Sequence, residues 1–424
     1  MSNTLTPSGL QSSAGLYGSC GVYQFDRNGA IFNPLDLNPY LLFDAESSMI
    51  GTLENPTLDL DPTKQETLDV ITATRAGTAT FVNLDGEIEI AQPNTVRVDS
   101  SLGYPAILVE PSSENLVTAT QEVASWSATN VSVTSNTTTA PDGSQTGDTV
   151  TRTAGGADVR QTKAVTSGTS YTISIFAKAE TDNEISLDLS DSRMGPDKVE
   201  FNTRTGQKVS GSANYSITEL SNGWRRYSFT STCISSGNTG VIVRIENDEP
   251  VQLWGFQFEE GSVPTSYIPT SGGDAAARTR NADQLSLSTS VTSSFFSSTD
   301  GGTFYAEFVP RNLVNEQWYL LSGQDTSRRF MYSNANNAQL RAFDGTTVRT
   351  FGSDMVENQL NRAAFTYTTT TQEASINGST VAAFSHNGNY LTTSRLYLSS
   401  PVNDKQMNGH IKRLLFWPVS SERL

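Results

Sequence analysis

The chain has 424 residues, a mass of 45.8 kDa and a formal net charge of −16 at pH 7. At about 150 residues per domain, this length predicts two to three domains that each bury a core. The acidic balance argues against partners that need a positive surface, so we expect neither nucleic-acid binding nor attachment to an anionic membrane. No apolar run approaches the roughly 18 residues that span a bilayer, so no membrane insertion is expected.

The composition favours an all-β protein. Only 17% of the residues are charged and 9% are aromatic, while Ser, Thr and Gly are abundant, which suits strands, turns and polar sheet faces. Cys20 and Cys233 are the only cysteines, and His386 and His410 are the only histidines. We therefore expect no disulfide framework, no metal site and no cofactor. The N-terminus carries no secretory signal, which predicts a soluble protein made in a cytosol.

The first 70 residues predict an extended N-terminal arm rather than a compact domain. Glycines and prolines recur too often there for long helices or strands. An apolar cluster in the same stretch needs cover from water, and docking onto a neighbouring protein would supply it. A loose terminus, the alternative, would leave the cluster exposed. The candidate attachment residues are Leu35, Leu37, Tyr40, Leu41, Leu42 and Phe43.

Two β-rich regions follow the arm. Residues 71–112 predict a β-hairpin connector, because ATFVNLDGEIEI reads as two short strands around the turn Leu84-Asp85-Gly86. Residues 113–270 alternate apolar and polar positions through about eight strands, which indicates a jelly-roll sandwich. The residues expected on its core face include Tyr171, Ile173, Ile175, Ile185, Leu187 and Leu189.

The last strand-like segment of this region, VQLWGFQFEEG, has apolar residues at successive positions. Simple alternation puts Val251, Leu253 and Gly255 on one face and leaves Gln252, Trp254 and Phe256 on the other. Since neither face is polar, we expect both to be covered.

The C-terminal part of the chain predicts a second sandwich. Residues 271–299 predict a linker, and residues 300–424 then repeat the strand rhythm, with a hairpin signal at Asn377-Gly378. The predicted fold class is therefore all-β, with two antiparallel β-sandwich domains, the first of jelly-roll type, after an extended arm.

Several motifs occur in succession over residues 72–283. They are Arg75-Ala76, Glu110-Pro111, Asn115-Leu116, Gly223-Trp224, Trp254-Gly255, the run Ser266-Tyr267-Ile268-Pro269-Thr270, and RTRNAD at 278–283. This succession resembles a recurrent module of bacteriophage structural proteins, in which a hairpin leads into a jelly roll like that of carbohydrate-binding modules. Residues 300–424 are similar, less specifically, to concanavalin-A-like or laminin-G-like lectin sandwiches. Residues 1–70 match no such family, and the resemblance implies that virion-specific attachment lies there.

Sugar recognition, which the resemblance implies, requires exposed aromatic rings together with amides and carboxylates. In the polar stretch 332–344, Tyr332, Asn336 and Asp344 could converge on a ligand. Trp126 lies near a predicted loop and is a further candidate, although packing at the sandwich edge is the alternative. Three other tryptophans lie in strands and are expected in the core: Trp224, Trp254 and Trp417.

The sequence does not predict an enzyme. Acidic pairs such as Glu87 and Glu89 share a strand face at about 6.5–7 Å, which is within glycosidase range but common in strands. The chain has no nucleophile elbow, no phosphate-binding loop and no catalytic strand of the kind that concanavalin-like glucanases carry.

The resemblance implies a bacteriophage virion surface protein, assembled in the bacterial host cytoplasm. In this interpretation it is a fibre-like adhesin, fixed to other virion proteins by its arm and displaying lectin-like sandwiches to host-surface polysaccharide. A homotrimer is expected by analogy with fibres. The alternative is a head decoration or tail-assembly protein that binds no host, and an enzyme that degrades surface polysaccharide is a third possibility.

Overall fold

The computed structural model describes most of the chain after residue 55 and only strand backbones before it. The described residues are 16–18, 21–25, 31–32, 41–43, 50–52, 56, 58–189, 192–195, 198–270, 277–295, 301–313, 317–323, 329–334, 337–368, 370–379, 382–385, 395–401 and 405–418. The chain divides into two units: unit 1 is Met1–Thr72 with Gln284–Leu424, and unit 2 is Ala73–Asp283. Unit 2 is thus inserted into the sequence of unit 1.

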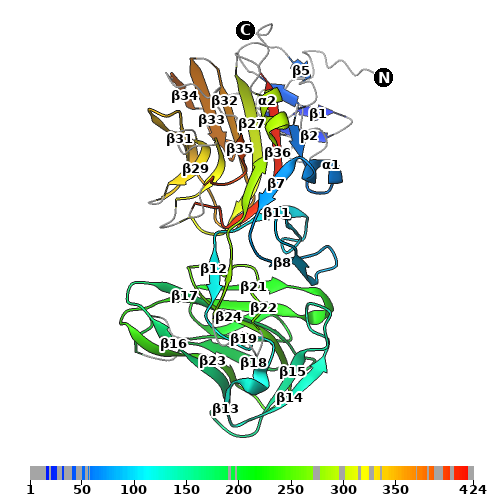
Figure 1. The fold of residues 1–424 in the computed structure, drawn as a ribbon, viewed down its shortest axis with the longest axis vertical. Helices are drawn as coiled ribbons and strands as arrows, with labels where there is room; N and C mark the ends of the chain where they lie inside the picture. Colours follow the sequence, from blue (N-terminus) through cyan, green and yellow to red (C-terminus); the bar gives the residue numbers. More distant parts are fainter. Residues whose placement is uncertain are drawn as a thin grey trace. The chain divides into compact units, whose positions relative to one another are not determined.

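Unit 2 contains two six-stranded sheets (Figure 1). The first sheet has the order β13 (Ser127–Thr129), β16 (Asp158–Val165), β23 (Gly237–Ile245), β18 (Glu184–Asp188), β19 (Lys198–Asn202) and β20 (Gln207–Gly211). The second has the order β14 (Val131–Thr138), β15 (Gly147–Arg152), β24 (Val251–Glu260), β17 (Ser170–Lys178), β22 (Arg225–Thr232) and β21 (Tyr215–Glu219). Two short 3-10 helices, η2 (Val123–Ser125) and η3 (Ser221–Gly223), lie between strands.

The main core of unit 2 is built by alternation along these strands. All six residues predicted to face the core are buried in one apolar cluster. Neighbouring strands pair antiparallel throughout both sheets. The predicted all-β fold with antiparallel sandwich sheets is therefore confirmed.

A β-bulge changes which residues of β24 point toward the main core. Gly255 and Phe256 lie opposite Ile175 alone, and Gly255 has a φ of 66°. The extra residue reverses the alternation, so Phe256 joins Leu253 in the main core instead of sharing a face with Trp254. Both faces of the strand are covered, as expected. A Cβ at Gly255 would lie 2.6 Å from Phe176, so only glycine fits there.

The region predicted as a connector is part of unit 2. The hairpin prediction is confirmed, because β8 (Ala79–Val82) pairs with β9 (Ile88–Ala91). β10 (Val98–Asp99) pairs with β11 (Ala106–Val109), and β12 (Ser113–Asn115) pairs with β25 (Arg278–Arg280). The prediction of a separate connector at 71–112 is thus corrected: from Ala73 onward these residues belong to the same unit as the jelly roll.

The predicted linker at 271–299 is corrected as well. Its described part holds β25, β26 (Gln284–Leu287) and the short helix α2 (Thr289–Phe295). Leu285 and Leu287 are buried, so the alternation in β26 places apolar side chains in the interior of unit 1.

Two larger sheets and smaller N-terminal ones belong to unit 1. The first has the order β36 (Gly409–Pro418), β27 (Gly302–Pro310), β32 (Asn361–Tyr367), β33 (Thr371–Ile376) and β34 (Ala382–Ser385), and β6 (Leu58–Leu60) also pairs with β36. The second has the order β31 (Val348–Asp354), β30 (Asn337–Phe343), β29 (Arg329–Asn334), β28 (Tyr319–Gly323), β35 (Leu396–Tyr397), β26 and β7 (Ile71–Thr74). Asn377-Gly378 forms the predicted turn, with positive φ at both residues, but β31 was not predicted.

The N-terminal residues contain more regular structure than the predicted arm. β1 (Leu16–Gly18), β2 (Gly21–Phe25) and β3 (Ile31–Phe32) form a small sheet, and β4 (Leu41–Phe43) pairs with β5 (Ile50–Thr52). The short helix α1 (Gln65–Leu68) follows β6. The prediction of an extended arm over the whole of 1–70 is corrected, because these segments form hairpins and add a strand to a sheet of unit 1.

Candidate functional site

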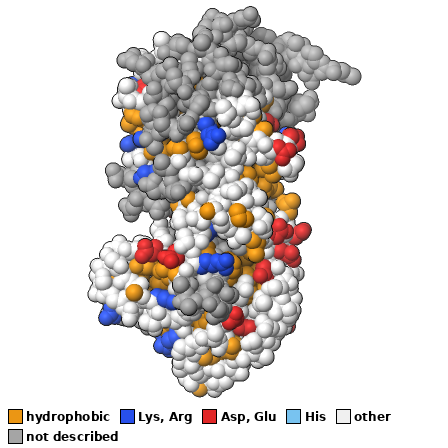
Figure 2. Space-filling view, viewed as in Figure 1, with side chains coloured by type: hydrophobic (Ala, Val, Ile, Leu, Met, Phe, Trp, Pro, Cys, Tyr) orange, Lys and Arg blue, Asp and Glu red, His pale blue; other side chains and the backbone are white. Residues whose placement is uncertain are grey.

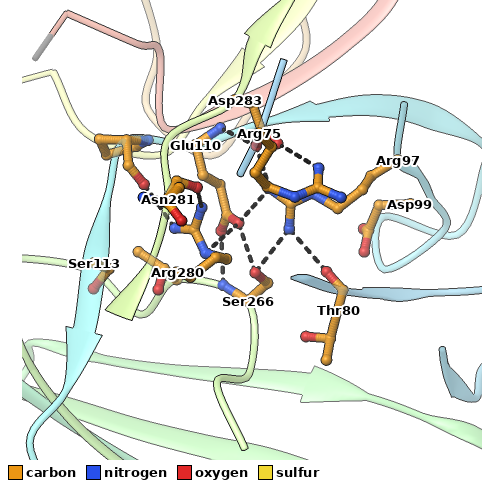
Figure 3. A network of polar contacts seen from close by, with 12 residues as sticks. Arg75, Thr80, Arg97, Asp99, Glu110, Ser113, Ser266, Arg280, Asn281 and Asp283 are labelled. Carbon is orange, nitrogen blue, oxygen red and sulfur yellow. Dashed lines mark hydrogen bonds and ion pairs between the residues drawn. The ribbon is translucent and has the colours of Figure 1, made fainter. Parts of the chain in front are cut away.

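Charged side chains from distant parts of the sequence meet inside unit 2 (Figure 3). Arg75 Nη1 lies 2.9 Å from Asp283 Oδ1, and Arg97 Nη2 lies 2.8 Å from Glu110 Oε2. Arg97 also contacts Asp283, and Arg280 Nε lies 3.5 Å from Glu110 Oε2. All five side chains are buried. We call Arg75, Arg97, Glu110, Arg280 and Asp283 the closing network.

The closing network also holds the backbone of both ends of unit 2. Arg75 donates to the carbonyl of Gln92, and Arg97 donates to the carbonyl of Thr80. The Glu110 carboxylate accepts from the backbone N–H and the hydroxyl of Ser266, at 2.7 and 2.6 Å. Because a buried charge needs several partners, these contacts fix the segments that lead into and out of the jelly roll.

The positive charges of the closing network are balanced by buried carboxylates. Three arginines face the carboxylates of Glu110 and Asp283, and the buried Glu259 adds a third negative charge. Burial works against the charged form of Arg97, but Asp283 and Glu110 outweigh it and raise the pKa of this group. Burial lowers the pKa of Arg280 despite the attraction of Glu110. The arrangement stabilises charge internally and presents none of it to a ligand.

Other residues of the motifs found in succession over residues 72–283 also form contacts inside unit 2. Asn115 Nδ2 donates to the carbonyls of Phe256 and Ile268, at 3.1 and 2.9 Å. The Tyr267 hydroxyl lies 2.7 Å from the Thr120 hydroxyl, and burial raises the pKa of Tyr267. The motif residues that carry the resemblance therefore have structural roles in the interior.

One outer sheet face of unit 2 carries several ion pairs. On the first sheet, Arg160 Nε lies 2.6 Å from Asp158 on the same strand, Arg244 contacts Asp188 on the neighbouring strand, and Lys198 Nζ lies 3.0 Å from Glu246, which follows β23. These residues alternate with core residues, so they face away from the apolar cluster. We call this surface the paired face. Elsewhere too, the side of the molecule seen in Figure 2 shows basic and acidic side chains interspersed.

The outer face of the second sheet of unit 1 contains Tyr332, one of the predicted ligand residues. Its ring is 2% exposed and lies under Arg329, whose guanidinium carbon is 5.2 Å from the ring centroid. Asp344 is fully buried, and its Oδ1 accepts from the backbone N–H groups of Thr346 and Thr347 in a tight turn. Asn336 lies outside the described residues.

Trp126 lies in the core of unit 2. Its ring centroid is 3.8 Å from that of Phe256, and its Nε1 donates to the carbonyl of Ala119. The ligand set predicted from the sequence is therefore corrected. Trp126 and Asp344 are enclosed by protein, and Tyr332 lies beneath an arginine that was not predicted. Arg97 and Arg329 were not singled out from the sequence, because their partners Asp283 and Tyr319 lie far away in sequence or on another strand.

Of the other residues named in the sequence analysis, some are buried and others lie outside the described residues. Leu41, Leu42 and Phe43 form β4, of which only the backbone is described, and Leu35, Leu37, Tyr40 and His386 lie outside the described residues. The predicted core tryptophans Trp224, Trp254 and Trp417 are buried, as are Cys233 and His410.

The described residues contain neither a candidate metal-binding cluster nor a helix that could span a membrane. No group of three or more His, Cys, Asp or Glu side chains there is placed to hold a metal ion. Among the same residues, no helix has both the length and the apolar character needed to cross a membrane.

Comparison with known proteins identifies no family. No family model and no curated protein matches the chain. Among solved structures, domains LG4-5 of the mouse laminin alpha1 chain align with 61% of this chain and 85% of their own length, at 8% identity and a TM-score of 0.24. The tripod from the baseplate of bacteriophage Tuc2009 aligns with 75% of this chain and 98% of its own length, at 12% identity and a TM-score of 0.20. At these TM-scores, neither similarity carries an argument about function.

Proposed function

We propose that the chain is a bacteriophage virion surface protein that acts as a fibre-like adhesin. Its N-terminal residues would attach it to other virion proteins, and its two sandwich units would meet host-surface polysaccharide. The protein would occur in the virion after assembly in the host cytoplasm. Each contact would be weak, and many copies on one particle would multiply the strength of attachment. A homotrimer would add to this multivalency.

The observation that supports this proposal is the closing network. The motifs that resemble the phage module are far apart in sequence, yet their residues interlock. Arg75 contacts Asp283 across 208 positions, and Glu110 accepts two hydrogen bonds from Ser266. These contacts support the proposal, because they join the separate motifs into one structural unit.

The proposed role is non-enzymatic. In unit 2 the carboxylates of Glu110, Glu259 and Asp283 are buried and hydrogen-bonded. A glycosidase needs two carboxylates that a sugar can reach from either side of its bond. These buried contacts stabilise the fold, which agrees with a protein whose role is to present a surface to the host.

The proposal is tested on purified virions with antibodies raised against residues 300–424. Antibody fragments that label the particle should lower host adsorption at least about tenfold, as expected if this region lies at the host contact. Fragments against an unrelated virion protein provide the control. Labelling with full adsorption would instead favour the head-decoration or tail-assembly role, and absence of the chain from virions would exclude both.

A further inference from the structure

Unit 2 occupies the place of a turn between two neighbouring strands of unit 1. In the second sheet of unit 1, β7 lies next to β26, although the two strands are far apart in the sequence. Unit 2 begins within β7 and ends at Asp283, directly before β26. An unfolded insertion at this position would oppose the pairing of the two strands, because the entropy cost of closing a loop grows with its length.

The closing network contains a direct contact between the two ends of this insertion. Arg75 follows the last residue of β7, and Asp283 precedes the first residue of β26. Their side chains meet at 2.9 Å across 208 positions of sequence (Figure 3). Both side chains are buried, at 1% and 2% exposure. Because separating a buried pair leaves its charges without partners, this contact keeps the two strand ends close together.

Each member of the pair is itself held by residues of unit 2. The carboxylate of Asp283 accepts from the backbone N–H of Glu110 at 3.0 Å, and the N–H of Asp283 donates to the carbonyl of Glu110 at 2.9 Å. The backbone N–H of Arg75 donates to Asn94 Oδ1 at 3.0 Å, and Arg75 Nη2 donates to the carbonyl of Gln92 at 2.7 Å. Folded unit 2 therefore sets the spacing of its own two ends.

Unit 1, in contrast, is divided by the insertion. The strands β6 and β7 come before unit 2, whereas their neighbours β36 and β26 come after it. The two segments of unit 1 must therefore meet across the whole of unit 2. While unit 2 is unfolded it is a long loop between them, and once it is folded it presents both segments side by side.

We propose that unit 1 folds only on folded unit 2, because the closing network brings β7 and β26 together. Unit 2 is continuous in sequence and its ends are tied by its own residues, so it would fold without unit 1. The dependence thus runs in one direction, from unit 2 to unit 1. This inference concerns the assembly of the chain and does not rest on the proposed adhesin function.

The first test follows both units of the full-length chain by hydrogen exchange over a series of urea concentrations. The double variant Leu187→Ala, Phe229→Ala removes side chains from the core of unit 2, and Phe304→Ala does the same in unit 1. Wherever unit 2 loses protection in the double variant, unit 1 should lose it too. Phe304→Ala should lower the urea midpoint of unit 1 and leave that of unit 2 unchanged.

Two results of this test overturn the proposal. Protection of unit 1 that outlasts that of unit 2 would show that the units fold independently. An equal fall of both midpoints in Phe304→Ala would show that the two units unfold as one cooperative body.

The second test weakens the Arg75–Asp283 pair itself. Arg75→Gln removes this contact but leaves Asp283 paired with Arg97. The variant should lower the urea midpoint of unit 1 relative to the wild type. The control Arg204→Gln breaks an exposed pair with Asp182 in unit 2 and should leave unit 1 unchanged. Equal midpoints of unit 1 in the two variants contradict the proposal.

Pulse-labelling hydrogen exchange during refolding tests the direction of the dependence. Amides of β17 and β22 in unit 2 should become protected before those of β27 and β32 in unit 1. Arg75→Gln should delay protection of unit 1 more than that of unit 2, because the strand ends are then held less closely. Protection of unit 1 first, or of both units at the same time, overturns the proposal.

Discussion

In unit 2 the arginines of the closing network face carboxylates, whereas in unit 1 Arg329 lies over aromatic rings. The closing network and the paired face neutralise each positive charge within the protein. The guanidinium of Arg329 lies over the rings of Tyr319, Tyr332 and Phe343. The comparison teaches that arginines on the strands and loops of this chain pack in two ways, against carboxylates inside unit 2 and against aromatic rings in unit 1.

The largest expected effect on stability comes from a substitution in the closing network. Glu110→Gln removes one carboxylate from a fully buried group of charges and leaves Arg97 and Arg280 in excess. Breaking a buried pair in this way should cost about 3–5 kcal/mol of the free energy of unfolding of unit 2. Urea denaturation of the full chain measures the loss.

The control for this variant is Glu219→Gln. Glu219 forms an exposed pair with Arg225, so its loss should cost less than about 1 kcal/mol. Similar costs for the two variants would show that unit 2 does not depend on its closing network.

The second-largest loss of stability in unit 2 is expected from a substitution at the bulge in β24. Gly255→Ala introduces a Cβ 2.6 Å from Phe176 at a residue whose φ is 66°. Backbone strain and overpacking together should cost about 2–4 kcal/mol. Gly103→Ala, also at positive φ but with open space around it, should show only the strain. If the two costs are equal, close packing at Gly255 is not needed.

Acid should weaken unit 1 through Glu307. Burial favours its neutral form, but Lys412, Tyr305 and Arg362 outweigh burial and lower the pKa of Glu307. A lowered folded pKa stabilises the protein above the unfolded pKa of about 4.3, and this stability is lost as the pH falls through the folded pKa. Glu307→Gln should therefore cost about 1–2 kcal/mol at pH 7, allowing for solvent around both cations.

The measurement is denaturation of the wild type and Glu307→Gln from pH 7 to pH 3. The difference in stability between them should shrink toward the acid end. A difference that is constant with pH, or that grows in acid, would show that the carboxylate does not titrate as described.

The smallest effect is expected on the paired face. Lys198→Gln breaks a partly exposed pair with Glu246 and should change the stability of unit 2 by less than about 1 kcal/mol. Urea denaturation checks this, and a loss as large as that of Glu110→Gln would show that this partly exposed pair contributes as much as the closing network.

The repeating pattern of strands could be predicted from the sequence, whereas the partners of single side chains could not. Tyr171, Ile173 and Ile175 occupy the predicted core face because period-two alternation decides strand burial. The hairpin of β8 and β9 follows its turn residues. Phe256 was assigned to the wrong face because one bulged residue reverses every position after it.

The candidate sites were harder to predict because they depend on long-range contacts. Arg75 meets Asp283 across 208 positions, and no local pattern reports such a pairing. Asp344 has the composition of a ligand residue but satisfies a buried turn. Tyr332 was chosen for its type, and its cationic neighbours come from β29 and β30, whose register shifts only the structure reveals.

Competition for host adsorption tests the central claim most directly. Purified full-length chain, added to host cells before virions that carry the same protein, should occupy the receptor and reduce adsorption in a dose-dependent way. Unchanged adsorption at saturating amounts of the wild-type chain would contradict the account of this protein as a displayed adhesin.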